Sequence, residues 1–263
     1  MVWLPLSPQL GVMKSILVVA LFFVSSPIFA AGWTLVSSEP RPAPNGLTFR
    51  EARVSDGATQ AVVYQVAFAP KTHAFAVMDN PDGAYDLGSA AAKRGALAGV
   101  NGGYFQPDRT PLGLVVRQGV QIHPLEKARL LSGVISVTPG TIAIQRTAAF
   151  KPAPAVREAL QAGPFLVENG KKIVGLNATK GAARTVVFQD AGGRAGFLIC
   201  KSVSLAEMAE ILATPSVFPD GKILRALNLD GGSSTALWVR GEPPFYQREW
   251  KSVRNYLAIV PRS

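Results

Sequence analysis

The chain has 263 residues, of which 48% are hydrophobic and 17% charged, so it can bury a substantial core. Its net charge is +10, but the basic residues are spread singly rather than in a Lys/Arg run, which argues against a nucleic-acid partner. The charge favours anionic partners such as phosphate esters, acidic glycans or an anionic membrane surface. The single cysteine, Cys200, excludes an internal disulfide and, within an apolar run, is interpreted as a packed core thiol.

Residues 13–30 predict a secretory signal peptide. They combine Lys14, an apolar stretch over 16–24 and the small residue Ala30 at the expected cleavage point. The apolar stretch is shorter than the roughly 20 residues that span a bilayer, although an uncleaved anchor is the alternative. We therefore expect a periplasmic or secreted protein with no stable membrane span after cleavage, and Met13 as the true start.

Strand-like segments fill most of the remaining chain, with either alternating or β-branched and aromatic patterns. The predicted strands are 46–54, 60–68, 72–78, 96–100, 113–117, 133–137, 141–145, 164–170, 185–189, 195–200, 223–229, 235–240 and 256–260. Helical signals are few: 89–97, a short helical turn over 158–163, and 204–212, where Ser204 and Glu207 form a capping box. These elements predict an α+β fold, a single domain with a mixed, twisted β-sheet and a few flanking helices.

The segment NLDGGSST at 228–235 places a carboxylate, two glycines and three hydroxyls directly after an apolar strand. Glycine allows positive φ and lets successive N–H groups converge on an anion. Asp230 could then act as nucleophile or base. The alternative is a tight hairpin capped by Asp and Ser. A serine hydrolase is not expected, because no histidine follows His123.

The segment NGGYF at 101–105 has the same design, with Asn101 and two glycines at the end of a predicted strand. An Asn side chain offers both a donor and an acceptor, which suits a sugar hydroxyl or a phosphate oxygen. Tyr104 or Phe105 could stack on the apolar face of a sugar. The alternative is an ordinary type I′ or II′ turn with two core aromatics.

Arg184 leads directly into a predicted buried strand, where an arginine usually has an anionic partner. That partner is either Asp230, in a structural pair, or a phosphate. No metal or cofactor is expected, since the sequence has no His pair at helical spacing, no Cys cluster, no EF-hand loop and no nucleotide-binding loop.

Six motifs together resemble the phosphodiester glycosidase family, which includes bacterial relatives associated with exopolysaccharide. In chain order they are NGGYF, TPLGLV, AGPFLVENG, ARTVV, ALNLDGGSSTALWV and VRNYL, within about residues 95–262. The resemblance divides the chain into 1–30 (upstream extension plus signal peptide), 31–94 (a strand-rich part) and 95–263 (the glycosidase-like catalytic region). Ser233 stands where the family commonly has a third glycine.

The resemblance implies an exported hydrolase that cleaves a sugar–phosphate diester, or a related anionic glycan, at the anomeric carbon. Our hypothesis for the catalytic residues is that Asp230 attacks the anomeric carbon or activates water, while Arg184 and Asn101 bind the phosphate together with the backbone N–H groups of Gly231 and Gly232. The implied substrate-binding residues are Gly102, Gly103, Tyr104, Gly231, Gly232, Ser234 and Thr235. The alternative function is a non-catalytic periplasmic protein that binds anionic polysaccharide. Asp108, Glu168 and Asp190 are candidates for a second carboxylate.

Overall fold

The structure is a computed structural model that describes residues 1–4 and 32–262. The predicted signal peptide and its cleavage point lie outside the described residues. In the part of the chain that is described, no helix is both long and apolar enough to cross a membrane.

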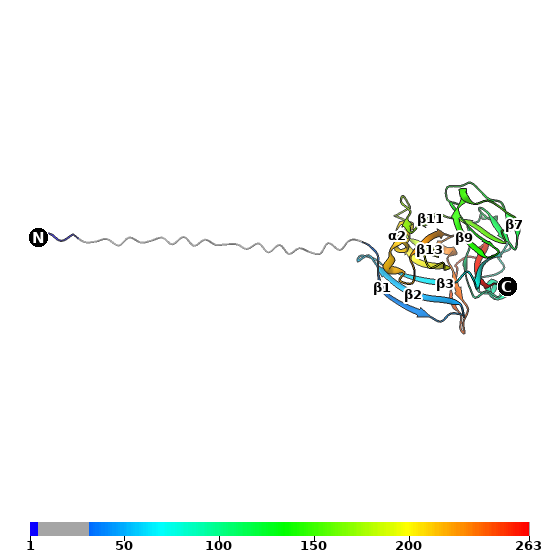
Figure 1. Cartoon of the computed structure of the whole chain (residues 1–263), viewed down its shortest axis with the longest axis horizontal. Helices are drawn as coiled ribbons and strands as arrows, with labels where there is room; N and C mark the ends of the chain where they lie inside the picture. The colour runs from blue at the N-terminus through cyan, green and yellow to red at the C-terminus, as the bar shows by residue number, and fades with distance from the viewer. Residues whose placement is uncertain (5–31, 263) are drawn as a thin grey trace. The chain divides into compact units, whose positions relative to one another are not determined.

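Strands dominate residues 32–262, where they form three antiparallel sheets (Figure 1). The first sheet has eight strands, in the order β1 (Thr34–Arg41), β2 (Leu47–Ser55), β3 (Gln60–Phe68), β14 (Ala195–Val203), β13 (Ala182–Asp190), β15 (Ile223–Asn228), β11 (Phe165–Glu168) and β12 (Lys171–Lys172). The second has five, β7 (Val120–His123), β6 (Val115–Arg117), β10 (Glu158–Ala162), β8 (Gly133–Thr138) and β9 (Thr141–Arg146). The third also has five, β17 (Phe245–Gln247), β16 (Leu237–Val239), β5 (Ala98–Asn101), β18 (Asn255–Pro261) and β4 (His73–Asp79).

One continuous apolar core joins the three sheets. It contains Phe165 and Leu227 of the first sheet, Ile135 of the second, and Val100 and Leu257 of the third, all at most 1% exposed. Because each sheet buries one face in this common core, the ends of strands from different sheets are brought together.

Two α-helices cover outer faces of the sheets. Helix α2 (Leu205–Ala213) packs on the first sheet, and α1 (Leu87–Arg94) packs on the third. The predicted capping box at Ser204 is confirmed, since its side chain accepts from the Glu207 N–H and the Glu207 carboxylate accepts from the Ser204 N–H. Three short 3-10 turns complete the fold: η1 (Thr147–Ala149), η2 (Pro215–Val217) and η3 (Gly232–Ser234).

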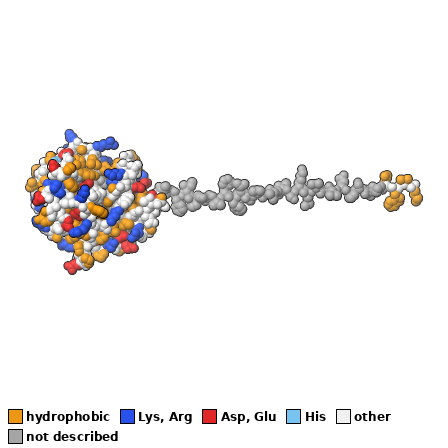
Figure 2. All heavy atoms as spheres, turned by 180° about the vertical axis from the view of Figure 1, so that it is seen from behind, with side chains coloured by type: hydrophobic (Ala, Val, Ile, Leu, Met, Phe, Trp, Pro, Cys, Tyr) orange, Lys and Arg blue, Asp and Glu red, His pale blue; other side chains and the backbone are white. Residues whose placement is uncertain are grey.

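Lysine and arginine side chains are scattered among apolar and acidic ones on the face drawn in Figure 2. No single basic stripe of the kind that tracks a nucleic-acid backbone appears on that face.

The expectation of a strand-rich chain with few helices is confirmed, but the single mixed sheet is wrong. Every strand pairing among residues 32–262 is antiparallel, and the strands divide into three sheets. The helical turn expected over 158–163 is also wrong. All five residues of β10 are buried, and the strand pairs with β6 on one side and β8 on the other, so tertiary pairing overrides the local helical pattern.

Candidate functional site

The two glycine-rich turns meet in the structure. Asn101 is the last residue of β5, in the third sheet, and Asp230 follows β15, in the first. The Asp230 N–H donates to the carbonyl of Gly102 (3.1 Å), and Nδ2 of Asn101 donates to the carbonyl of Asp230 (2.7 Å). The junction of two sheets thus brings together segments that lie more than a hundred residues apart.

Asn101 is fully buried, and its amide is used by the protein. Its Oδ1 accepts from the Thr185 hydroxyl (2.6 Å) and from the Ala236 N–H (3.1 Å), in addition to the bond that its Nδ2 makes to Asp230. One side chain therefore connects β13 to both ends of the turn that carries Asp230. This arrangement fits a positioning role better than direct contact with a phosphate.

Gly102 and Gly103 both bind a close neighbour, Asn255, the first residue of β18, and Asn255 leaves room only for glycine at position 102. The Gly102 N–H donates to the Asn255 carbonyl and the Gly103 N–H to its Oδ1, both at 2.9 Å. A Cβ at Gly102 would overlap the Asn255 side chain. Asn255 belongs to the motif VRNYL, but the sequence pattern assigned it no role. The available signal was an asparagine directly before the last predicted strand.

Tyr104 uses its hydroxyl rather than its ring face to contact the site. The hydroxyl oxygen lies 2.7 Å from the Gly163 carbonyl and 3.2 Å from the Leu229 carbonyl, and it accepts from Nδ2 of Asn228 (3.0 Å). Burial and then the charge of Asp230 hold the pKa of Tyr104 well above its usual range, so the phenol stays neutral. Asn228, which the sequence analysis did not single out, is therefore part of the site.

Asp230 is half-buried, whereas Ser233, three residues later in the same turn, is exposed. Within residues 32–262 the Asp230 carboxylate forms no ion pair, and its Oδ1 accepts from the Gly231 N–H (2.8 Å). Burial raises the pKa of Asp230, and the nearby Ser234 hydroxyl and the Gly231 N–H only partly offset this. A poorly hydrated carboxylate without a counter-ion is well suited to act as base or nucleophile.

The rest of the turn has backbone N–H groups without acceptors and hydroxyl groups that are buried. Gly232 has φ 62°, which favours glycine, and neither its N–H nor that of Ser233 has an acceptor among the described residues. Ser234 and Thr235 are only 7% and 8% exposed. Their hydroxyls thus lie mainly inside the protein, with Thr235 3.4 Å from the Thr185 hydroxyl.

Arg184 does not pair with Asp230, which was one of the two partners considered from the sequence. It is adjacent to Thr185 on β13, so strand alternation places it on the opposite face, beside Cys200 in the register of β14. Its Nε donates to the Val203 carbonyl (2.9 Å) and its Nη2 to the Lys180 carbonyl (2.6 Å). No hydrogen bond to another described residue uses Nη1.

The other carboxylates considered from the sequence have partners elsewhere. Asp108 accepts from the Thr110 N–H, Glu168 pairs with Arg146 (2.7 Å), and Asp190 pairs with Arg194 (2.7 Å). Among the described residues, no group of three or more His, Cys, Asp or Glu side chains is placed to hold a metal ion. Of the carboxylates considered from the sequence, Asp230 is the one that lies where the two glycine-rich turns meet.

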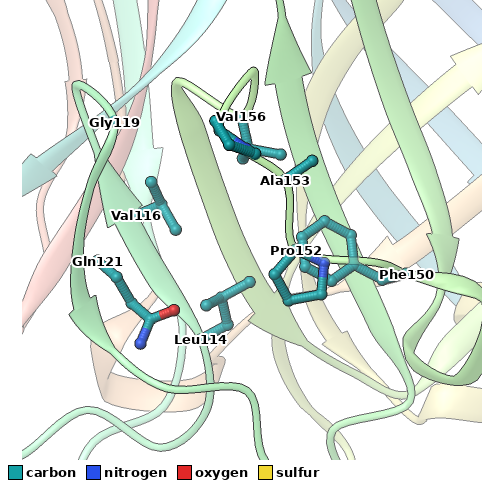
Figure 3. Close-up of a pocket in the computed structure, with 9 residues that line it drawn as sticks. Leu114, Val116, Gly119, Gln121, Phe150, Pro152, Ala153 and Val156 are labelled. Atoms are coloured by element: carbon teal, nitrogen blue, oxygen red, sulfur yellow. The ribbon is translucent and has the colours of Figure 1, made fainter.

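A separate, mostly apolar cavity of about 290 Å³ lies over the second sheet (Figure 3). Leu114 and Val116 form one side of it, and Phe150, Pro152 and Val156 form the other. It contains neither glycine-rich turn. Its lining suits an apolar group better than a sugar phosphate.

Residues 94–260 match the family model described as phosphodiester glycosidase. The chain belongs to the phosphodiester glycosidase family. Its two converging turns, with Asn101 and Asp230, lie inside the matched region. The family resemblance expected from the six motifs is thereby confirmed.

Solved structures share the fold of this phosphodiester glycosidase family member. A Synechocystis protein described as hypothetical has a TM-score of 0.63 at 17% identity, over 86% of this chain and 64% of that one, so the match spans somewhat less than two thirds of its length. The zebrafish N-acetylglucosamine-1-phosphodiester α-N-acetylglucosaminidase catalytic domain, auto-inhibited by pro-peptide, has a TM-score of 0.62 at 15% identity, over 86% of this chain and 89% of that domain.

A Burkholderia pseudomallei protein described as a "putative exported protein" has a TM-score of 0.52 at 14% identity, over 77% of this chain and 74% of that one. At these identities the likeness concerns the fold. No curated protein matches the sequence.

Asn101→Ala should destabilise the protein by about 2–4 kcal/mol, because it leaves the buried Thr185 hydroxyl and Ala236 N–H without their acceptor. Urea denaturation at neutral pH measures the change. The exposed Asn45, replaced by Ala, is the matched control. Equal stability of the two variants would contradict the positioning role of Asn101.

Asp230→Asn should change how stability depends on pH. Because burial raises the pKa of Asp230, the folded state binds a proton more tightly than the unfolded state does. The free energy of unfolding therefore falls as pH rises from the ordinary aspartate pKa to the raised one. The Asn variant lacks this loss and should be more stable than wild type above that window. Denaturation midpoints measured from pH 3 to 8 (roughly the span over which carboxyl groups titrate) test this, and superimposable profiles would refute it.

Proposed function

We propose that this chain hydrolyses a sugar–phosphate diester at the anomeric carbon. The observation that carries the proposal is the half-buried Asp230 carboxylate, free of any ion pair within residues 32–262 and fixed where two turns of a phosphodiester glycosidase family member meet. Support also comes from the shared fold of the zebrafish phosphodiester α-N-acetylglucosaminidase domain.

The reaction passes through an oxocarbenium-like state, while the phosphate leaves with the bonding electrons. A phosphate ester is a good leaving group, so strong general-acid assistance is less necessary than in an ordinary glycosidase. Asp230 acts on the anomeric carbon, either directly or through a water molecule that it deprotonates. Burial raises the pKa of Asp230, which makes its carboxylate a stronger base than that of an exposed aspartate.

The departing phosphate needs N–H donors and positive charge. Since the Gly231 N–H is occupied by Asp230, we assign the phosphate to the free N–H groups of Gly232 and Ser233. Arg184 lies on the other face of β13 from Thr185, so we assign it a longer-range electrostatic contribution to the departing phosphate. Its charge already acts on Tyr104, and its two carbonyl bonds fix the guanidinium. Asn101 is the positioning residue that holds the Asp230 turn.

The substrate class that we propose is an anionic glycan outside the cytoplasm. The predicted signal peptide and the net charge of +10 support this location and this class of partner. The shared fold of a protein described as a "putative exported protein" is consistent with export.

Asp230→Asn should reduce kcat on a glycosyl phosphodiester by roughly 10²–10⁴-fold, because the amide can neither attack nor accept a proton. Release of the phosphate monoester measures the rate, with Asn45→Ala as the control. Full activity of the Asn variant would refute the assignment of Asp230. Binding of glycan by wild type without any turnover would instead identify a binding protein.

Arg184→Ala should lower kcat more for substrates with poor leaving groups, since those need more stabilisation of the departing phosphate. A series of glycosyl aryl phosphates, whose departing aryl phosphates differ in pKa, gives the comparison, and Arg184→Lys separates charge from geometry. A loss of the same size for every substrate, together with lower stability, would show that Arg184 only ties β13 to β14.

A further inference from the structure

The loop 248–252 lies against the Asp230 turn and carries an exposed tryptophan. The backbone N–H of Trp250 donates to the carbonyl of Ser233 (2.9 Å), three residues after Asp230. We propose that Trp250 is the stacking platform of a second sugar subsite, which binds a residue of an anionic glycan next to the one that reacts. The proposal rests on the proposed function and extends it from a small diester to an oligomeric or polymeric substrate.

The backbone around Trp250 is fixed from several sides. The Glu249 carboxylate accepts from the Leu87 N–H (2.7 Å), the Tyr246 hydroxyl (3.0 Å) and the Tyr256 hydroxyl (2.9 Å). In addition, Arg248 pairs with Asp86 (2.7 Å), and the Ser252 hydroxyl donates to the Gly83 carbonyl (2.8 Å). Trp250 is therefore presented by an ordered loop, which lowers the entropy lost when a ligand binds.

The indole ring of Trp250 has no packing role in the described fold. It is 90% exposed, whereas Trp33 and Trp238 are 3% and 7% exposed. A large apolar ring that remains in water on a well-anchored loop marks a surface on which something else is buried. Its position beside Ser233 connects that surface directly to the Asp230 turn.

The surroundings of Trp250 match an anionic sugar. A cavity of about 270 Å³ beside it is lined by the rings of Tyr85 and Tyr246 and by the charged residues Arg248 and Lys251. Aromatic rings can cover the apolar C–H face of a sugar, while the cations face a carboxylate or phosphate group. Asp86 and Glu249 lie on the same surface, and this mixture of charges disfavours insertion into lipid.

The test uses the full chain carrying Asp230→Asn, so that the ligand is not consumed. The probes are a panel of oligouronates and phosphorylated oligosaccharides of one to six sugars, with affinity measured by calorimetry. Adding Trp250→Ala should weaken binding of the longer probes by about tenfold or more and leave binding of single sugar phosphates unchanged. Trp250→Phe should recover most of the affinity, and Val120→Ala, a similarly exposed apolar residue on β7, should have no effect.

The outcomes separate the subsite from the proposed function. Chain-length-dependent binding that requires Trp250, without hydrolysis by the wild-type chain, would support the subsite and overturn the glycosidase. Hydrolysis with equal affinity in both Trp250 forms would overturn the subsite alone, as would a panel in which no probe binds. A change in molar mass by light scattering on Trp250→Ala would show that the ring joins two copies of the chain, and it would also overturn the proposal.

Discussion

The buried amide of Asn101 is the contact on which the candidate site depends. It donates to the backbone of Asp230 and accepts from Thr185 and Ala236, so one side chain links three segments from two sheets. Each of these bonds is shielded from water, and a missing partner would leave a polar group unpaired in the core. The position of Asp230 is therefore set by the same network that holds the sheets together.

In contrast to that network, the Asp230 carboxylate lies in an energetically unfavourable environment. The fold places it where burial raises its pKa, yet provides no cation within residues 32–262 to neutralise it. Burying this carboxylate without a cation costs stability in the free protein. In the proposed reaction, that cost is offset when positive charge develops opposite the carboxylate. Fixed hydrogen bonds to the backbone around Asp230 keep the turn from rearranging to avoid this cost.

Local sequence patterns predicted the strands well where the turns between them were also specified. The break at 55–58 gave the β2–β3 hairpin, and Asn169-Gly170, both at positive φ, gave the β11–β12 turn. The pattern failed at 158–162, because burial between two neighbouring strands decides that segment and local sequence does not report it. Sheet number and strand direction were likewise beyond reach, since both depend on pairings distant in the chain.

The site was predicted in part for the same reason. Polar residues beside glycines at strand ends pointed to Asn101 and Asp230, and these two do meet. The roles of Asn228 and Asn255 could not be predicted, because single asparagines in strands show no partner until the sheets are assembled. The side of β13 on which Arg184 lies could not be fixed either, since it depends on the register with β14.

The supports of the Trp250 loop have a consequence for how this scaffold can diverge. Its contacts come largely from the surface segment 83–87, whereas the Asp230 turn is held from the core by Asn101. The proposed catalytic carboxylate and the proposed glycan platform thus belong to two separately held segments that touch at Ser233. Under that proposal, grafting a different 248–252 loop together with its matching 83–87 segment should change which glycan is bound without altering the contacts that hold the Asp230 turn.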